Sequence, residues 1–285
     1  ASIATTLANA VQALGTGNII LRGVSGTGIY VTASNAINTA SGNITIYADN
    51  YIVNMANGIS AANILNMNAY TNIGMSIGTS VSLTANVSNS VLGNVSAGTQ
   101  YIFGSTVTGT GTSNTGDITI DTTRDFGDKH VTFIAGNDVN LNSALTKATG
   151  TGIANYLLRA NNRVSFANGS VLANTGAINL TLNSDYDQAT NLGGAISIAG
   201  TSVINTNGGS LVIGGGTSPT TQNAYGTSSS GYGVQISGGS SIQTGAGNIT
   251  IRGENTGTAG NIGVLISGAL STTTGTINIY GKTRS

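Results

Sequence analysis

The chain has 285 residues, of which 43 are glycine, one is proline and none is cysteine. Charged residues are only 6% of the sequence, against about 25% in ordinary soluble domains, and nine basic residues balance nine acidic ones. This balance removes any electrostatic preference for nucleic acid or an anionic membrane, and the missing cysteine excludes disulfides and cysteine-based metal sites. High hydrophobic content with low charge is the reverse of a disordered composition. We therefore expect a folded chain rich in strands and tight turns.

The N-terminal residues 1–27 are predicted to form a helical turn followed by the first strand. Thr5 or Thr6 can cap the helix, and Gly15 can end it. Three apolar residues would share one helical face: Leu7, Val11 and Leu14. The residues GNIILRG at 17–23 then predict a strand.

A pattern of three short apolar strands, separated by glycine and small polar residues, recurs along the rest of the chain. In three copies the apolar residues are spaced by eight and then seven positions. These residues are Val234, Ile242 and Ile249; Ile196, Ile204 and Leu211; and Ile29, Ile37 and Ile44. A fourth copy, at residues 263–281, has lost about two residues from its middle.

Other segments carry a weaker strand signal or none. Residues 50–115 are irregular and rich in asparagine, with single strands expected at the pairs Ile64/Met67 and Val81/Leu83. Residues 116–144 predict three strands, and these centre on Ile118, Val131 and Val139. Residues 214–231 contain the only proline and no apolar periodicity, so we predict a loop inserted at a corner of the fold.

Three strands per repeat, joined by turns too short for crossover helices, predict a chain wound as a coil. Each turn would bury the apolar face of its neighbour, and parallel strands would pair along the axis. We therefore predict an all-β fold, a single elongated β-solenoid domain over residues 1–285 with about ten turns of three short strands. A sandwich or barrel of hairpins is the rival architecture, and it predicts two-residue Asn-Gly or Asp-Gly turns.

Two sets of residues carry a resemblance to a known family. The first consists of Ile3, Thr6, Leu7, Ala10, Val11, Leu14, Gly17, Asn18, Ile19 and Leu21. The second is the G-[NDT]-I-x-I element, which begins at Gly42, Gly116, Gly247 and Gly275. Together they resemble the repeat region of filamentous-haemagglutinin-type exoproteins, in which a segment of the form I-x-x-x-T-L-x-x-A-L-x-x-G-x-N-V-x-I often precedes G-x-I-x-I strands. The resemblance implies a right-handed parallel β-helix and secretion by the bacterial two-partner pathway through an outer-membrane transporter.

The function expected from this resemblance is structural and adhesive. The chain would be a shaft segment of a large secreted protein at the bacterial cell surface, mediating attachment or filament formation rather than catalysis. Its partners would be glycans or proteins of a host or neighbouring cell, and the end strands permit end-to-end self-association. We expect no cofactor and no membrane insertion, since no apolar run is long enough to span a bilayer.

The strongest candidate for chemistry is a charged cluster in residues 117–130. It contains Asp117, Asp121, Arg124, Asp125, Asp128, Lys129 and His130. Paired carboxylates with a basic residue are typical of β-helical polysaccharide lyases and hydrolases, so Asp121, Asp125, Asp128 and His130 are weak catalytic candidates. Asp125 and Asp128 are also weak Ca²⁺ ligand candidates. A solvated corner with local ion pairs is the simpler interpretation of the same residues.

Three further features have two interpretations each. The acidic turn at Asp185, Tyr186 and Asp187 is a metal site or an ordinary exposed turn. Outward tyrosines, among them Tyr30, Tyr47 and Tyr280, stack on sugars or pack across turns, and packing is favoured because the chain has no tryptophan. Six N-x-[ST] sequons are glycan sites or coincidences of composition. Their asparagines are Asn43, Asn86, Asn94, Asn168, Asn179 and Asn248.

Overall fold

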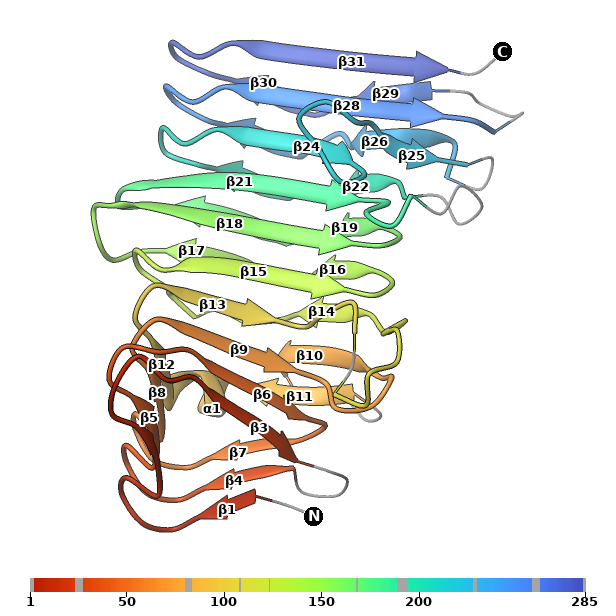
Figure 1. Cartoon of the computed structure of the whole chain (residues 1–285). Coiled ribbons are helices and arrows are strands. Elements are labelled where there is room, and N and C mark those ends of the chain that lie inside the picture. The colour runs from red at the N-terminus through yellow and green to blue at the C-terminus, as the bar shows by residue number, and fades with distance from the viewer. Residues whose placement is uncertain are drawn as a thin grey trace. The chain divides into compact units, whose positions relative to one another are not determined.

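The computed structural model describes residues 3–23, 28–79, 84–107, 109–122, 124–167, 169–188, 194–227, 230–257 and 262–283. These residues form an all-β fold of short strands joined by turns, with one five-residue helix in the described part of the chain (Figure 1). All of the named strand pairs are parallel rather than hairpins. The prediction of an all-β chain with parallel strands is therefore confirmed.

The chain divides into two compact units. One comprises Ala1–Arg124 and Lys129–Gly136, and the other comprises Asp125–Asp128 and Asn137–Ser285. In both units most consecutive strands belong to different sheets and pair with strands from neighbouring repeats; β10 with β11, and β24 with β25, are consecutive strands that share a sheet.

The first unit contains four groups of hydrogen-bonded strands. In strand order these are β1-β4-β7, β2-β5-β8-β12, β3-β6-β9-β13-β15 and β11-β10-β14. The bounds are β1 Ile3–Thr5, β2 Val11–Ala13, β3 Ile19–Gly23, β4 Ile29–Val31, β5 Ile37–Thr39, β6 Ile44–Ala48, β7 Tyr51–Val53, β8 Ile59–Ala61, β9 Ile64–Asn68, β10 Gly74–Gly78, β11 Thr84–Ser88, α1 Asn89–Gly93, β12 Val95–Ala97, β13 Gln100–Phe103, β14 Ile118–Ile120 and β15 His130–Ala135.

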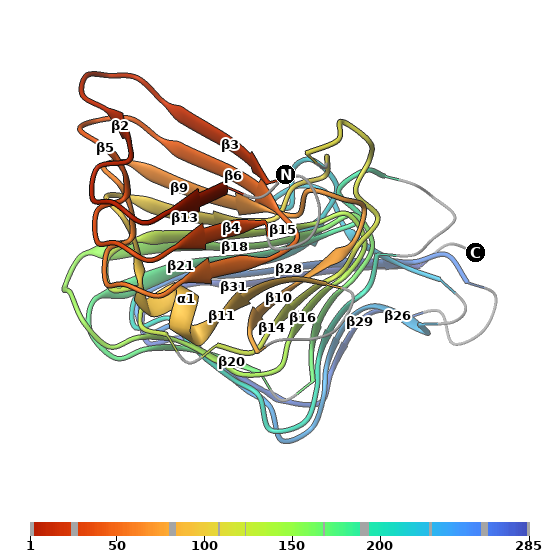
Figure 2. The ribbon, with the colours of Figure 1, turned by 90° about the horizontal axis from the view of Figure 1, so that it is seen from below.

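The second unit contains three groups, β16-β19-β22-β26-β29, β17-β20-β23-β27-β30 and β18-β21-β24-β28, with β25 and β31 also paired to β28. Figure 2 shows strands of the three groups on three different sides of this unit. The bounds are β16 Val139–Leu141, β17 Ala144–Lys147, β18 Ile153–Ala160, β19 Val164–Phe166, β20 Ser170–Ala173, β21 Ala177–Ser184, β22 Ile196–Ile198, β23 Val203–Asn205, β24 Leu211–Gly215, β25 Ala224–Gly226, β26 Tyr232–Ile236, β27 Ser241–Gln243, β28 Ile249–Asn255, β29 Ile262–Ile266, β30 Ala269–Ser271 and β31 Ile277–Thr283.

The register of the strands confirms the repeat spacing inferred from the sequence. Ile196 pairs with Val234, Ile204 with Ile242, and Leu211 with Ile249. All six of these side chains are completely buried. Burying such a side chain contributes roughly 1.5–3 kcal/mol, so the columns of aliphatic residues supply the core of the second unit.

The helix expected in residues 1–17 is wrong, because this segment forms the strands β1 and β2. Ile3 pairs with Ile29, and Val11 pairs with Ile37. The apolar face required by a helix is also missing, since Leu7 is 72% and Leu14 is 80% exposed. Parallel pairing with the next repeat satisfies this backbone, and the left-handed φ of 58° at Asn9 turns the chain between the two strands.

The loop expected at residues 214–231 is only partly correct. It contains the strand β25, which pairs with residues Gly253 to Asn255 of β28. Strand β28 is seven residues long and β24 pairs only with its first half, so its second half needs another partner. In residues 50–115 the strand at Ile64 is confirmed, whereas Val81 and Leu83 lie outside the described residues.

Close packing between repeats explains the glycine of the G-[NDT]-I-x-I element. A Cβ atom on Gly247 would strike the carbonyl oxygen of Gly209, and one on Gly275 would strike the carbonyl oxygen of Gly247. Gly42 faces Gly17 in the same way in the first unit. The element therefore marks a position where the backbones of neighbouring repeats leave no room for a side chain.

Replacing Gly247 with alanine is expected to lower the free energy of unfolding by about 1–3 kcal/mol, because the added methyl group must displace backbone. Chemical denaturation followed by circular dichroism measures this loss. Gly238→Ala is the matched control, since the nearest atom to its added Cβ is 3.9 Å away. That variant is expected to be neutral or slightly stabilising. Equal losses in the two variants would contradict the packing explanation.

Candidate functional site

The charged cluster predicted from the sequence is divided between the two units. Asp121, Arg124 and His130 belong to the first unit. The Arg124 guanidinium donates a hydrogen bond to the Tyr101 hydroxyl at 3.0 Å and lies over its ring, 5.2 Å from the centroid. Asp121 accepts a hydrogen bond from Thr79 at 3.2 Å. These contacts tie the residues to their neighbours in the fold.

Asp125 and Asp128 belong to the second unit, where each accepts hydrogen bonds from protein donors. Asp125 accepts from the backbone N–H of Ala148 at 3.0 Å and from the hydroxyl of Thr149 at 2.6 Å. Hydrogen bonds to its carboxylate hold the pKa of Asp125 below its ordinary value, against the opposing effect of burial. Asp128 pairs with the buried Lys147 at 2.5 Å. Both carboxylates therefore stabilise the local fold, Asp125 through Ala148 and Thr149 and Asp128 through Lys147.

The second unit also contains a polar pocket of about 380 Å³. Residues from three separate segments line it: Asp185, Gln188, Gly216, Thr221, Gln222, Asn223, Tyr225 and Glu254. Of these, Asp185 belongs to the acidic turn noted in the sequence and the residues from Gly216 to Tyr225 lie in the predicted 214–231 loop, whereas the sequence did not single out Gln188 or Glu254. Pockets of roughly 300–1,000 Å³ with a few convergent polar groups are typical of small-ligand sites, so this is the candidate functional site.

Turns after neighbouring strands of one sheet build the pocket wall. Asp185 follows β21 directly, and Asp185 and Gln188 adopt left-handed backbone with φ of 50° and 56°. Gly216 follows β24, also with positive φ, and leads into the turn that ends at β25. The Gln222 side chain closes this turn by accepting a 2.7 Å hydrogen bond from the backbone N–H of Ser218. Left-handed conformations of non-glycine residues are costly and cluster at functional sites.

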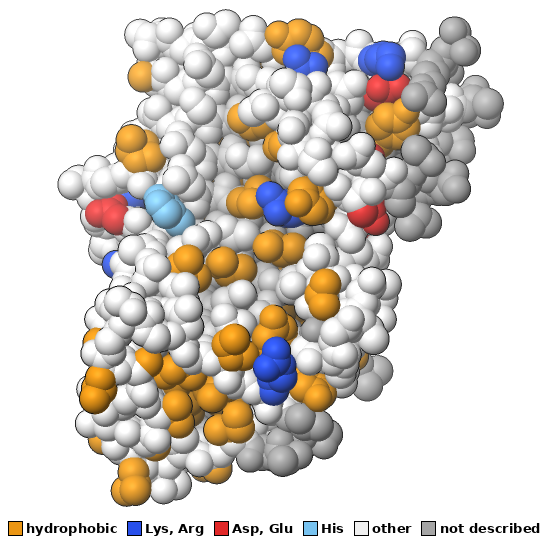
Figure 3. All heavy atoms as spheres, viewed as in Figure 1, with side chains coloured by type: hydrophobic (Ala, Val, Ile, Leu, Met, Phe, Trp, Pro, Cys, Tyr) orange, Lys and Arg blue, Asp and Glu red, His pale blue; other side chains and the backbone are white. Residues whose placement is uncertain are grey.

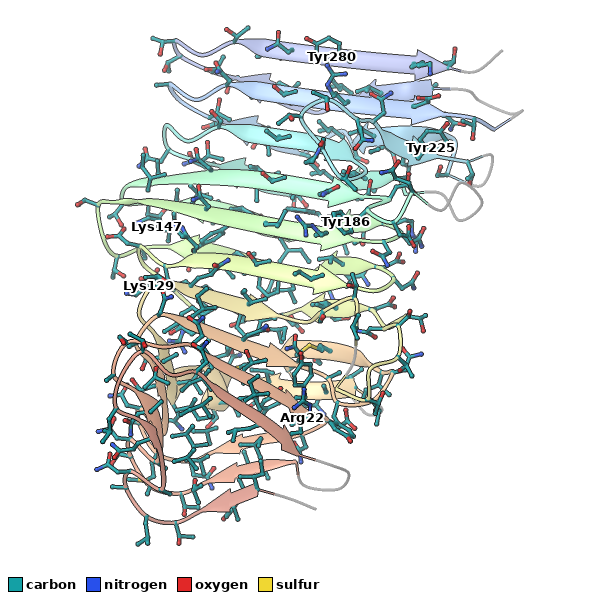
Figure 4. The ribbon with its side chains drawn as sticks, viewed as in Figure 1. Arg22, Lys129, Lys147, Tyr186, Tyr225 and Tyr280 are labelled. Carbon is teal, nitrogen blue, oxygen red and sulfur yellow. The ribbon has the colours of Figure 1, made fainter. Side chains whose placement is uncertain are left out.

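Glu254 is a buried carboxylate at the wall of the pocket, with 4% of its surface exposed. Asn223 donates to its Oε2 at 3.1 Å, and the Tyr225 hydroxyl donates to its Oε1 at 3.3 Å. Lys282 of β31 completes the set with an ion pair at 3.0 Å. Three donors from two segments therefore fix the position of this carboxylate, and the Tyr225 side chain is labelled in Figure 4.

Asp185 is the opposite case, a buried carboxylate that no side chain or backbone donor within the described residues engages. Its side chain lines the pocket although only 8% of the residue is exposed. Burial, reinforced by the nearby charge of Asp187, raises the pKa of Asp185 from 3.8 to about 6. The pocket thus combines one fixed carboxylate with one whose hydrogen-bonding capacity is unused.

No family model, curated protein or solved structure matches this chain. Its function must therefore be inferred from its own fold and site. Within the residues described, no helix is long and apolar enough to cross a membrane. The same residues contain no cluster of three or more His, Cys, Asp or Glu side chains suited to a metal ion.

The raised pKa of Asp185 gives a pH dependence of stability with a definite sign. The folded chain holds this proton up to about pH 6, whereas the unfolded chain releases it near 3.8. The free energy of unfolding should therefore decrease as the pH rises from 4 to 6. The expected decrease is about 1–2 kcal/mol, because solvent in the pocket screens part of the effect. Thermal melting of Asp185→Asn should lack this decrease, and the variant should be the more stable one at pH 7. Asp187→Asn, at an exposed position, should retain most of it.

Two of the outward tyrosines, Tyr47 and Tyr280, pack against arginines of adjacent strands. The guanidinium of Arg22 lies 5.3 Å from the Tyr47 ring centroid, and that of Arg252 lies 3.9 Å from the Tyr280 centroid. Each pair occupies adjacent strands in register, and Arg22 and Tyr280 are labelled in Figure 4. Cation–π contacts of this kind contribute about 0.5–1 kcal/mol at exposed sites.

The sequon asparagines are engaged in hydrogen bonds at all five described positions. The side-chain amides of Asn86, Asn94 and Asn179 donate to Thr84, Val53 and Asn155, respectively. Those of Asn43 and Asn248 accept from the backbone of Ile64 and Thr276 in the next repeat. Asn168, the sixth, lies outside the described residues. These side chains contribute to strand stacking rather than standing free.

Proposed function

We propose that the chain is a right-handed parallel β-helix of about ten turns, and that it is a structural and adhesive segment of a secreted bacterial surface protein. The support for the coil is the recurrence of three strands per repeat, each paired in parallel with its counterparts in adjacent repeats. Right-handedness is the near-universal hand of parallel β-strand crossovers and agrees with the resemblance to filamentous-haemagglutinin-type repeats.

Ladders of polar side chains support a stiff shaft. On one edge of the second unit, Asn179 donates to Asn155 at 3.0 Å and accepts from the backbone of Ser210 at 3.0 Å. The ladder continues in the next two repeats. The backbone N–H of Asn248 donates to the Ser210 hydroxyl at 3.2 Å, and the backbone N–H of Thr276 donates to the Asn248 side chain at 2.8 Å. Each rung is therefore tied to the next by a side chain as well as by the sheet.

The surface is suited to contact with uncharged partners. On the face in Figure 3, charged side chains are few and separated, and most of the surface is backbone and uncharged polar groups. Such a surface exerts little long-range attraction, so binding would depend on close hydrogen bonding with glycans or proteins of another cell. The proposal includes secretion through an outer-membrane transporter, which the resemblance implies, and end-to-end self-association through the end strands.

The observation that carries the proposal is the register of buried aliphatic residues from repeat to repeat, because a shaft built of stacked turns requires this arrangement. Beads coated with the purified chain should adhere to bacterial or epithelial cells more than beads coated with an unrelated β-rich protein. Equal adhesion of the two bead types would overturn the adhesive role.

A carbohydrate-active enzyme is the second candidate, and the pocket is the observation that favours it. Asp185 and Glu254 are two carboxylates in contrasting environments, the arrangement that glycoside hydrolysis requires of its acid and base. The alternative site at Asp121, Asp125, Asp128 and His130 lies outside the lining of this pocket, and its three carboxylates already accept hydrogen bonds from Thr79, Thr149 and Lys147. New reducing ends released from neutral polysaccharides, and lost in Glu254→Gln, would support the enzyme.

A further inference from the structure

The pocket next to β25 has a chemical composition that suits a selective ligand site. Its polar atoms come from two carboxylates, three carboxamides and two hydroxyls. No Lys or Arg belongs to its described lining, and Lys282 reaches it only through its ion pair with Glu254. The pocket therefore presents hydrogen-bond acceptors with negative charge and neutral donors.

The unused carboxylate of Asp185 points to a missing partner. This carboxylate opens on the pocket, where burial removes part of its hydration and no described protein donor replaces it. Asp185 is more than nine-tenths buried and lines the pocket. A ligand hydroxyl would supply the donor that the described protein residues do not.

The rest of the lining is arranged to orient such a ligand. Asn223 and Tyr225 are held by Glu254, so their side chains are already ordered before any ligand arrives. Preorganised groups lose little entropy on binding. The Tyr225 side chain adds an aromatic surface with a polar tip, which suits a molecule that has both C–H and O–H groups.

We propose that this pocket binds one neutral, hydroxyl-rich sugar residue of a glycan, with Asp185 accepting hydrogen bonds from its hydroxyls. An acidic sugar is disfavoured because its carboxylate would meet Asp185 and Glu254 with like charge. A Ca²⁺ ion is disfavoured because it takes six to eight oxygen ligands, and fewer than three acidic side chains gather there in the described chain. The inference rests on the proposed adhesive function, since it supplies the glycan contact.

Titration of the whole chain in solution tests the site. The probes are the methyl glycosides of glucose, galactose, mannose and N-acetylglucosamine, with glucuronate, galacturonate and CaCl₂ as charged comparisons, followed by calorimetry or ligand-observed NMR. At least one neutral glycoside should saturate the chain below about 10 mM, and the uronates should not. Binding of the uronates with equal affinity, binding of Ca²⁺ alone, or binding of no glycoside would overturn the proposal.

Variants locate the binding. Asp185→Ala should weaken the affinity by about tenfold or more, as expected when a hydrogen bond to a charged group is lost. Tyr225→Leu should also weaken it. Asp187→Ala is the matched control, because Asp187 lies in the same turn but does not line the pocket, and its affinity should be unchanged. Circular dichroism verifies that each variant is folded, and unchanged affinity in folded Asp185→Ala and Tyr225→Leu would overturn the site.

The bead assay separates this inference from the adhesive role. If Asp185→Ala beads adhere as well as unmodified beads, adhesion stands and the pocket is not its contact. If no beads adhere while the glycoside still saturates the chain through Asp185, the pocket stands and the adhesive role fails.

Discussion

Replacing Ile213 with alanine is expected to lower the free energy of unfolding by about 2–5 kcal/mol. Ile213 lies in β24, where its side chain is completely buried. In the stacked strands it is in register with Leu182 on one side and Ile251 on the other. Truncation removes the transfer free energy of three carbon atoms and leaves a cavity between two rungs that the parallel backbone holds in place.

The matched control for this substitution is Val212→Ala on the same strand. The side chain of Val212 faces the other side of the sheet and is only half-buried, so its truncation should cost about 0.5 kcal/mol. Denaturant unfolding of the two variants, compared by their midpoints at a common slope, measures the difference. Similar losses in both would contradict the inward column of aliphatic residues.

The regular repeats were predictable because two local signals agree in them. Alternation of apolar and polar residues identifies the strand, and glycine with small polar residues identifies the turn. The constant spacing from Val234 to Ile242 to Ile249 then aligns one repeat with another, and the observed register follows that alignment. No long-range information was needed where each repeat copies the last.

Prediction failed where the spacing was ambiguous or interrupted. Leu7, Val11 and Leu14 fit a helical period. A helix would form hydrogen bonds only within itself, whereas β1 and β2 form them with strands of the next repeat. In residues 50–115, the strands β10 and β11 and the helix α1 interrupt the three-strand order. Such tertiary competition is not visible in a local window of sequence.

The pocket was only partly predictable. Asp185 was visible as part of an acidic turn, but Glu254 and the turn before β25 meet it only through the fold. One signal was present: aligning Gly247 with Gly275 places Glu254 opposite Lys282 and Arg252 opposite Tyr280, as the structure pairs them. In a chain with so few charges, an acid aligned with a base in the next repeat indicates an ion pair between the two strands.

Removing the carboxylate of Asp128 is the other substitution with a large expected effect. Lys147 is the last residue of β17, has no exposed side-chain surface, and is labelled in Figure 4. Its ammonium donates to Asp128 at 2.5 Å and to the carbonyl oxygens of Thr149 and Gly150 at 3.1 and 2.9 Å. Asp128→Ala removes the carboxylate that is in direct contact with this buried charge. A loss of about 3 kcal/mol is expected, at the low end for buried pairs because Asp128 is itself half exposed.

A second substitution separates the ion pair from simple packing. If the cost arises from the stranded ammonium, Asp128→Ala combined with Lys147→Met should be less destabilised than Asp128→Ala alone, because methionine fills the space without a charge. Denaturant unfolding of the set gives the coupling. Asp187→Ala, which removes an exposed carboxylate, should stay within about 0.5 kcal/mol of the parent chain.

The same variants test the roles that the sequence raised for Asp128. A Ca²⁺ ligand would make stability depend on Ca²⁺ concentration, since an ion that binds only the folded chain stabilises it by mass action. The structural role requires instead that the melting temperature of the parent chain stay constant when Ca²⁺ is added or chelated. A catalytic carboxylate, for its part, usually costs stability, so its removal should stabilise the fold. A loss near 3 kcal/mol that is independent of Ca²⁺ would assign Asp128 to holding Lys147 in the core.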